Sequence, residues 1–238
     1  MKLTSDGLKM LSRIFISCNP IHNSTTEELQ GEFVNAQGLS TNQLYLIRSA
    51  KSGKVFEFEE YVAGLPNKNS LPKYLKIKKF AERMCSNVID EKIVLMFFGG
   101  SDHIEKALVD NREFKINHDF GVILLFIHLV IPVKITKIVG DFYEGVYANS
   151  EYEVRIKGLV PLLNSIPSMN DIEIKVGDLV LTHYASIIAP DVSDEMKEYL
   201  LGQQGESEQY MQACKEIEEM DFNSFWDLSK WTRQIANM

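Results

Sequence analysis

The sequence contains few cysteines and no long uninterrupted apolar run. Its three cysteines, Cys18, Cys85 and Cys214, lie far apart, which excludes a disulfide scaffold and a four-cysteine zinc site built from this chain alone. The longest apolar stretch, residues 120–133, is shorter than the ~20 residues that a membrane-spanning helix needs, so it predicts a buried strand. Residues 1–18 carry basic side chains at helical spacing, which predicts an amphipathic helix and no secretory signal.

The composition is that of an ordinary globular protein. Of its 238 residues, 45% are hydrophobic and 24% are charged, which is enough apolar material for a core. Since neither a signal sequence nor a membrane span is apparent, we expect a cytoplasmic protein.

Charge changes sign along the chain. Residues 1–80 carry 11 basic and 7 acidic side chains, whereas residues 151–238 carry 7 basic and 16 acidic ones. The basic N-terminal third therefore permits contact with nucleic acid or an anionic membrane, and the acidic C-terminal third disfavours both.

Hydrophobic periodicity predicts the α+β class. A helical N-terminal region (1–66) precedes a β-rich core (67–190) with a mostly antiparallel sheet, and an acidic helical arm (191–238) follows. Helices are expected at 25–35, 41–50, 72–87, 102–109, 192–201 and 207–220. Strands are expected at 93–98, 114–117, 121–126, 132–139, 143–148, 152–156, 171–176 and 178–184.

The segment 24–50 has the outline of a helix-turn-helix, with Gly38 in the turn. A DNA-binding version would present five side chains to base edges: Thr41, Asn42, Gln43, Tyr45 and Arg48. It would make the protein a DNA-binding regulator, whereas a plain helical hairpin gives the same spacing. The basic residues expected to meet nucleic acid or another anion are Arg48, Lys51, Lys54, Lys73, Lys76, Lys78 and Lys79.

A catalytic alternative rests on a Glu-x-Lys strand. Glu173 and Lys175 alternate with apolar residues, and Asp141 lies upstream. This arrangement resembles the metal-binding core of restriction-like nucleases, a resemblance that implies carboxylates holding Mg²⁺ and a lysine positioning water. The Pro-Asp usual in that family is missing, and a cross-strand ion pair gives the same pattern. Otherwise no motif indicates a cofactor or a metal site.

Residues 92–101 are loosely similar to a strand-turn stretch of rhabdovirus-type matrix proteins. This resemblance implies an α+β assembly protein, although the net charge of −8 argues against coating a membrane.

The interpretation we favour is a non-catalytic interaction or assembly protein that binds another protein or itself through the C-terminal arm. The arm follows Gly202 and Gly205, which we interpret as a hinge. It combines an acidic face with aromatic side chains, a combination that suits a helix-in-groove contact. The residues expected to bind the partner are Tyr210, Ile217, Phe222, Phe225, Trp226 and Trp231.

Overall fold

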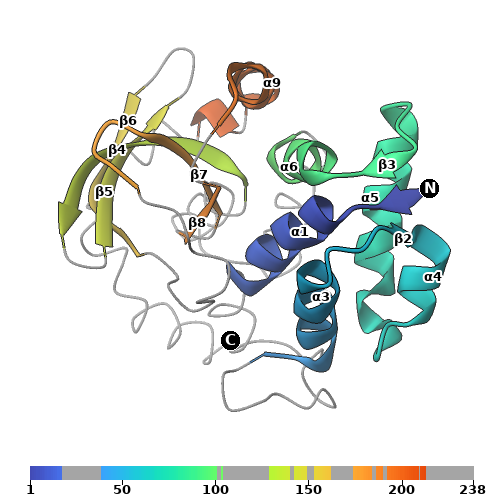
Figure 1. The fold of residues 1–238 in the computed structure, drawn as a ribbon. Helices are drawn as coiled ribbons and strands as arrows, with labels where there is room; N and C mark the ends of the chain where they lie inside the picture. Colours follow the sequence, from blue (N-terminus) through green and yellow to red (C-terminus); the bar gives the residue numbers. More distant parts are fainter. Residues whose placement is uncertain are drawn as a thin grey trace, which may run out of the picture. The chain divides into compact units, whose positions relative to one another are not determined.

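The described residues form two compact units, which divide between Phe97 and Phe98. The first unit is mainly helical and the second contains a five-stranded antiparallel sheet (Figure 1). Helices and antiparallel strands together confirm the predicted α+β class. The computed structural model describes residues 1–17, 39–100, 103, 129–139, 142–148, 153–161, 174–183, 186–189, 192–208 and 210–212.

The first unit is built around a three-stranded sheet. Its central strand is β1 (Lys2–Leu3), which pairs antiparallel with β2 (Phe56–Glu57) and parallel with β3 (Val88–Ile89). Helix α1 (Ser5–Ser17) follows β1. It confirms the amphipathic helix predicted from the spacing of basic side chains in residues 1–18. It packs so close to β3 that a Cβ on Gly7 would lie 2.5 Å from the Ile89 carbonyl oxygen.

The next helices begin at recognisable local signals. Helix α3 (Thr41–Lys51) starts with a capping box, in which the Ser40 hydroxyl accepts from the Gln43 backbone and the Gln43 side chain accepts from the Ser40 backbone. The helix expected at 41–50 is thereby confirmed. A short helix α4 (Phe58–Ala63) follows β2.

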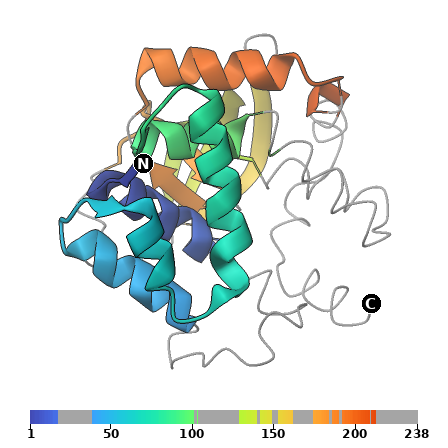
Figure 2. The ribbon, with the colours of Figure 1, turned by 90° about the vertical axis from the view of Figure 1, so that its right-hand side faces the viewer.

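Helix α5 (Leu71–Arg83) is coloured green in Figure 2. It has a proline in its first turn, at a position where the missing N–H costs nothing. It confirms the helix expected from residue 72, although it ends four residues early. A short 3-10 helix, η2 (Lys68–Ser70), precedes it. The boundary expected at residue 66 would place α5 in the central segment, whereas the structure includes it in the first unit.

Helix α6 (Glu91–Gly99) corrects the strand expected at 93–98. Every residue from 93 to 100 is buried, so the sequence shows no polar face that would reveal a helical period. The helix begins where the Asp90 carboxylate accepts from the Ile93 backbone N–H, at 2.9 Å. Where a helical segment has no exposed residue, as at 93–99, its cap is the local signal that identifies it, because hydrophobic periodicity is absent.

Tyrosines form part of the core of the first unit. The hydroxyls of Tyr61 and Tyr74 lie 3.3 Å apart and both side chains are buried. Burial raises the pKa of both hydroxyls far above the ordinary value, so they stay neutral as a hydrogen-bonded pair. The Tyr45 hydroxyl donates to the Tyr61 carbonyl oxygen from the edge of this cluster.

The described strands of the second unit form an antiparallel sheet in the order β6-β5-β4-β7-β8. Its strands are β4 (Ile131–Val139), β5 (Phe142–Ala148), β6 (Glu153–Pro161), β7 (Leu179–His183) and β8 (Ser186–Ala189). The strands expected at 132–139, 143–148 and 178–184 are therefore confirmed with small shifts at their ends. The strand expected at 152–156 is confirmed too, but it continues to Pro161.

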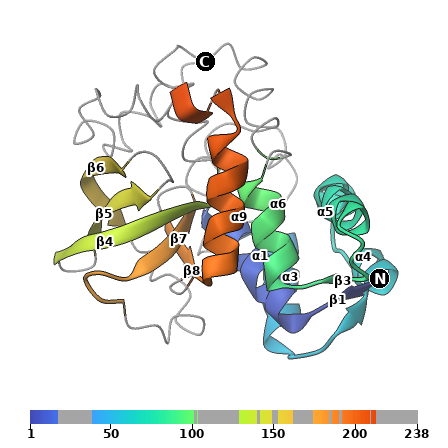
Figure 3. The same ribbon diagram turned by 90° about the horizontal axis from the view of Figure 1, so that it is seen from above.

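Helix α9 (Asp194–Gly205) contacts β4 (Figure 3). It confirms the helix expected from residue 192, but it continues through the glycines that we interpreted as a hinge. Gln204 explains the difference: it is fully buried, and its amide donates to the carbonyl oxygens of Gly99 and Val130. These tertiary hydrogen bonds outweigh the low helix propensity of the flanking glycines.

Among the described residues, no helix is both long enough and apolar enough to cross a membrane. The helices expected at 25–35 and 102–109, and the strands expected at 114–117 and 121–126, lie outside the described residues, apart from His103. So does the helix expected at 207–220 beyond residue 212.

Candidate nucleic-acid interface

The strand order of the second unit is its most informative feature. The first strand of the sheet, β4, pairs with the second, β5, and with the fourth, β7. The third and fifth strands, β6 and β8, form the two edges and approach each other. The described strands thus follow the connectivity 3-2-1-4-5, which is also the strand order of the OB-fold, a five-stranded Greek-key barrel.

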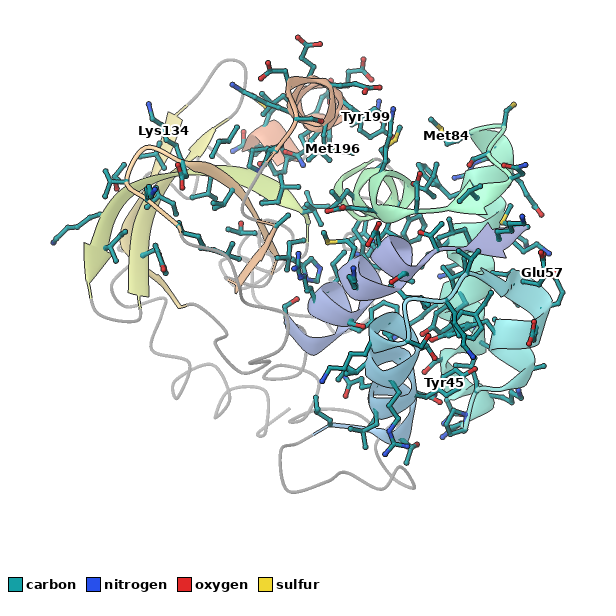
Figure 4. All side chains as sticks on the ribbon, in the orientation of Figure 1. Tyr45, Glu57, Met84, Lys134, Met196 and Tyr199 are labelled. Atoms are coloured by element: carbon teal, nitrogen blue, oxygen red, sulfur yellow. The ribbon has the colours of Figure 1, made fainter. Side chains whose placement is uncertain are left out.

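A bulge in β4 brings two lysines to one face of this sheet. Lys134 pairs with Val146, and Lys137 pairs with Glu144, two residues earlier on β5. Residues three apart on a regular strand face opposite sides, but the register shift between Ile135 and Lys137 absorbs one residue. Lys134 and Lys137 therefore share a face, and both are exposed; Figure 4 labels Lys134.

This lysine-bearing face is the outer face of the sheet. Val133, next to Lys134, is fully buried and pairs with the fully buried Val180, so the two valines belong to the inner face. Val146 and Leu179, which stand opposite Lys134, are half-buried. Together these residues make an outer surface that is partly apolar and carries positive charge.

Gly145 shapes the sheet beneath this surface. It stands opposite Ile135, and a Cβ at this position would collide with the Val133 side chain and lie 3.1 Å from the Lys134 carbonyl oxygen. Only glycine permits β4 and β5 to approach so closely at the bulge. The close approach of β4 and β5 beneath the lysines therefore depends on a residue that carries no functional group.

The turn before β7 contains Lys175, one of the residues expected in a catalytic site. Lys175 is exposed and donates its backbone N–H to the Asp178 carboxylate at 2.7 Å. Residues 174–178 form coil and a turn, with Gly177 at φ +98°, so Lys175 does not lie on a strand as expected. Asp141 and Glu173 lie outside the described residues, which contain no cluster of three metal-ligating side chains.

The basic residues expected to bind an anion all lie in the first unit. Arg48 and Lys51 are exposed near the end of α3, and Lys54 is exposed in the turn that follows. Lys73, Lys76 and Lys79 are exposed on α5, whereas Lys78 of the same helix is less exposed and forms ion pairs.

Of the five residues expected to meet base edges, Asn42, Gln43 and Tyr45 form hydrogen bonds within the fold, whereas Arg48 is exposed. Asn42 is buried; its amide nitrogen donates to the Asn67 carbonyl and the Ser70 hydroxyl, and its oxygen accepts from the Asn67 backbone. Gln43 closes the capping box of α3 and donates to the Phe15 carbonyl. Most of the preceding helix of the predicted helix-turn-helix lies outside the described residues.

Of the residues expected to bind a partner through the C-terminal arm, Tyr210 is described and is fully buried. Ile217, Phe222, Phe225, Trp226 and Trp231 lie outside the described residues. The assembly role of the arm therefore stays a prediction.

Sequence spacing offers no indication of a buried aromatic cluster in the second unit. The rings of His103 and His183 have centroids 6.3 Å apart, and Phe98 lies 4.7 Å from His103 and 6.0 Å from His183. Both histidines are buried. Because they are far apart in the sequence, no local motif joins them.

Comparisons with protein-family models, with curated proteins and with solved structures find no match to this chain.

Proposed function

We propose that the protein binds single-stranded nucleic acid on the outer face of its five-stranded sheet. The observation that carries this proposal is the strand order, because OB-folds bind oligonucleotides across the face of their second and third strands and the adjoining loops. Here those strands are β5 and β6, and Lys134 and Lys137 lie on the strand beside them. Topology supports the function by analogy, and the lysines add a chemical reason.

The charge of the strands favours a phosphate polymer over a neutral oligosaccharide. Four basic and two acidic residues lie on the five strands, although the whole chain is acidic. An exposed lysine that neutralises a phosphate releases a counterion, and each such contact strengthens binding at low salt. A neutral sugar offers no such gain.

The test measures the anisotropy of a labelled oligothymidylate bound to the full-length protein at several salt concentrations. Lys134→Gln/Lys137→Gln removes two charges from the sheet, so the slope of log K against log salt should fall by about 1.4 for a single strand. By the same relation, affinity at about 0.1 M salt should fall about 25-fold. A duplex of the same length should bind more weakly to the unaltered protein.

Lys2→Gln/Lys9→Gln is the matched control, because it removes two exposed lysines from the first unit and changes the net charge equally. It should leave the salt slope unchanged. The proposal is wrong if the unaltered protein fails to bind single strands. It is also wrong if the sheet variant, Lys134→Gln/Lys137→Gln, binds them with the same affinity and salt slope as the unaltered protein.

A further inference from the structure

Helix α5 carries a stripe of basic residues on its solvent side. Lys76, Lys79 and Arg83 follow at spacings of three and four residues, so they share one face of the helix within about 60° of each other. All three are exposed. The opposite face packs into the first unit through Tyr74, Ile77, Phe80 and Ala81, each at most 5% exposed.

The positive charges of Lys76 and Lys79 are not neutralised by the neighbouring carboxylates, because those carboxylates form ion pairs with Lys78. Lys78 lies on the flank of α5 and pairs with Glu59 at 2.6 Å and Glu82 at 4.0 Å. Its hydrogen bond to Glu59 lowers the pKa of that carboxyl and raises the pKa of Lys78. No carboxylate of the described residues lies within ion-pair distance of Lys76 or Lys79.

The packing of α5 decides which anionic partner suits the stripe. A helix that lies in a membrane surface inserts an apolar face, but the apolar face of α5 is already buried in its own unit. Leu75, 41% exposed, is the one large apolar side chain exposed on the body of α5.

We propose that Lys76, Lys79 and Arg83 form a second contact surface for the phosphate backbone of nucleic acid. The stripe extends over about 10 Å of helix, which suits a short run of neighbouring phosphates. It reads no sequence, because lysine and arginine contacts to phosphate position a strand without identifying its bases. The identity of the ligand rests on the proposed function of the sheet, whereas the site itself rests on α5 alone.

The decisive variant is Lys76→Gln/Lys79→Gln, since glutamine preserves helix propensity and removes two charges. With a labelled oligothymidylate of about 30 nucleotides, long enough to extend beyond one OB-type site, the salt slope should fall by about 1.4 and affinity at about 0.1 M salt about 25-fold. The matched control, Lys2→Gln/Lys9→Gln, changes the net charge equally and should leave both unchanged. Thermal unfolding followed by circular dichroism should be the same for all three proteins.

The two proposals fail in different ways. If the stripe variant keeps the unaltered slope while the sheet variant Lys134→Gln/Lys137→Gln loses affinity, the second surface is refuted and the function of the sheet stands. If the stripe variant loses affinity and the sheet variant does not, the stripe is supported and the sheet proposal fails. Equal losses in the control and the stripe variant would indicate general electrostatic attraction and refute the stripe.

Vesicles rich in phosphatidylserine test the lipid alternative. They should not bind the unaltered protein at the salt concentration where the oligonucleotide binds. Binding to vesicles that disappears in Lys76→Gln/Lys79→Gln would overturn the assignment to nucleic acid.

Discussion

Replacing Gly145 by alanine tests whether the close approach of β4 and β5 requires glycine at this position. The new Cβ would collide with a side-chain methyl group of Val133, which is fully buried, and would lie 3.1 Å from the Lys134 carbonyl oxygen. Extra atoms in a packed core typically cost about 1–3 kcal/mol. The lower backbone entropy of an unfolded chain with alanine offsets up to about 1 kcal/mol. We therefore expect Gly145→Ala to lower the free energy of unfolding by about 1–2 kcal/mol.

Urea denaturation of the full-length protein measures this change, and hydrogen exchange of the β4 amides locates it in the second unit. The specific claim concerns Val133, so a double-mutant cycle tests it. Val133→Ala alone removes buried methyl groups and costs stability. In combination with Gly145→Ala it makes room for the new Cβ, so the double variant should cost at least about 1 kcal/mol less than the sum of the singles.

Gly177→Ala is the matched control. Gly177 has φ +98°, and a Cβ added there would meet no atom within 4 Å, so alanine strains the backbone without touching a neighbour. It should cost about 1 kcal/mol and show no coupling to Val133→Ala. Additive costs for Gly145→Ala and Val133→Ala would refute the claim that glycine is needed for the close approach of β4 and β5.

Two further predictions concern the first unit. Tyr61→Phe or Tyr74→Phe should each lower the free energy of unfolding by about 1–3 kcal/mol, because each leaves a buried hydroxyl without its 3.3 Å partner. The double variant should cost less than the sum in urea denaturation, and strict additivity would contradict a hydrogen-bonded pair. Lys78→Gln should raise the pKa of Glu59 toward the ordinary value, as measured by NMR titration, whereas Lys79→Gln should not. Since the folded pKa of Glu59 is lowered, its ion pair stabilises the fold above the ordinary pKa of glutamate, and this contribution disappears as the pH falls through the lowered pKa.

Local signals are sufficient for the helices that begin at caps or prolines. The capping box at Ser40 and the proline near the start of α5 fix the first turn of each helix from neighbouring residues alone. Residues 93–99 of α6 are all buried and lack an amphipathic pattern, so their sequence favours a strand. Gln204 illustrates a further limit, because the carbonyl groups that hold it in α9 belong to Gly99 and Val130, which are distant in the sequence.

The two candidate surfaces differ in how far sequence determines them. The lysines of α5 can be predicted as a group, but the closer partner that distinguishes Lys78 from Lys76 and Lys79 is Glu59, which lies on α4. On the sheet, the alternation of side chains along a regular strand would place Lys134 and Lys137 on opposite faces. The bulge that brings both to the same face depends on pairing with β5. The same pairing sets the strand order, which is a property of contacts between distant segments. The candidate face of the sheet depends on a bulge and a strand order, so it cannot be predicted before the chain is folded. The basic helix can be predicted from its sequence, and the folded structure then shows which of its lysines are paired.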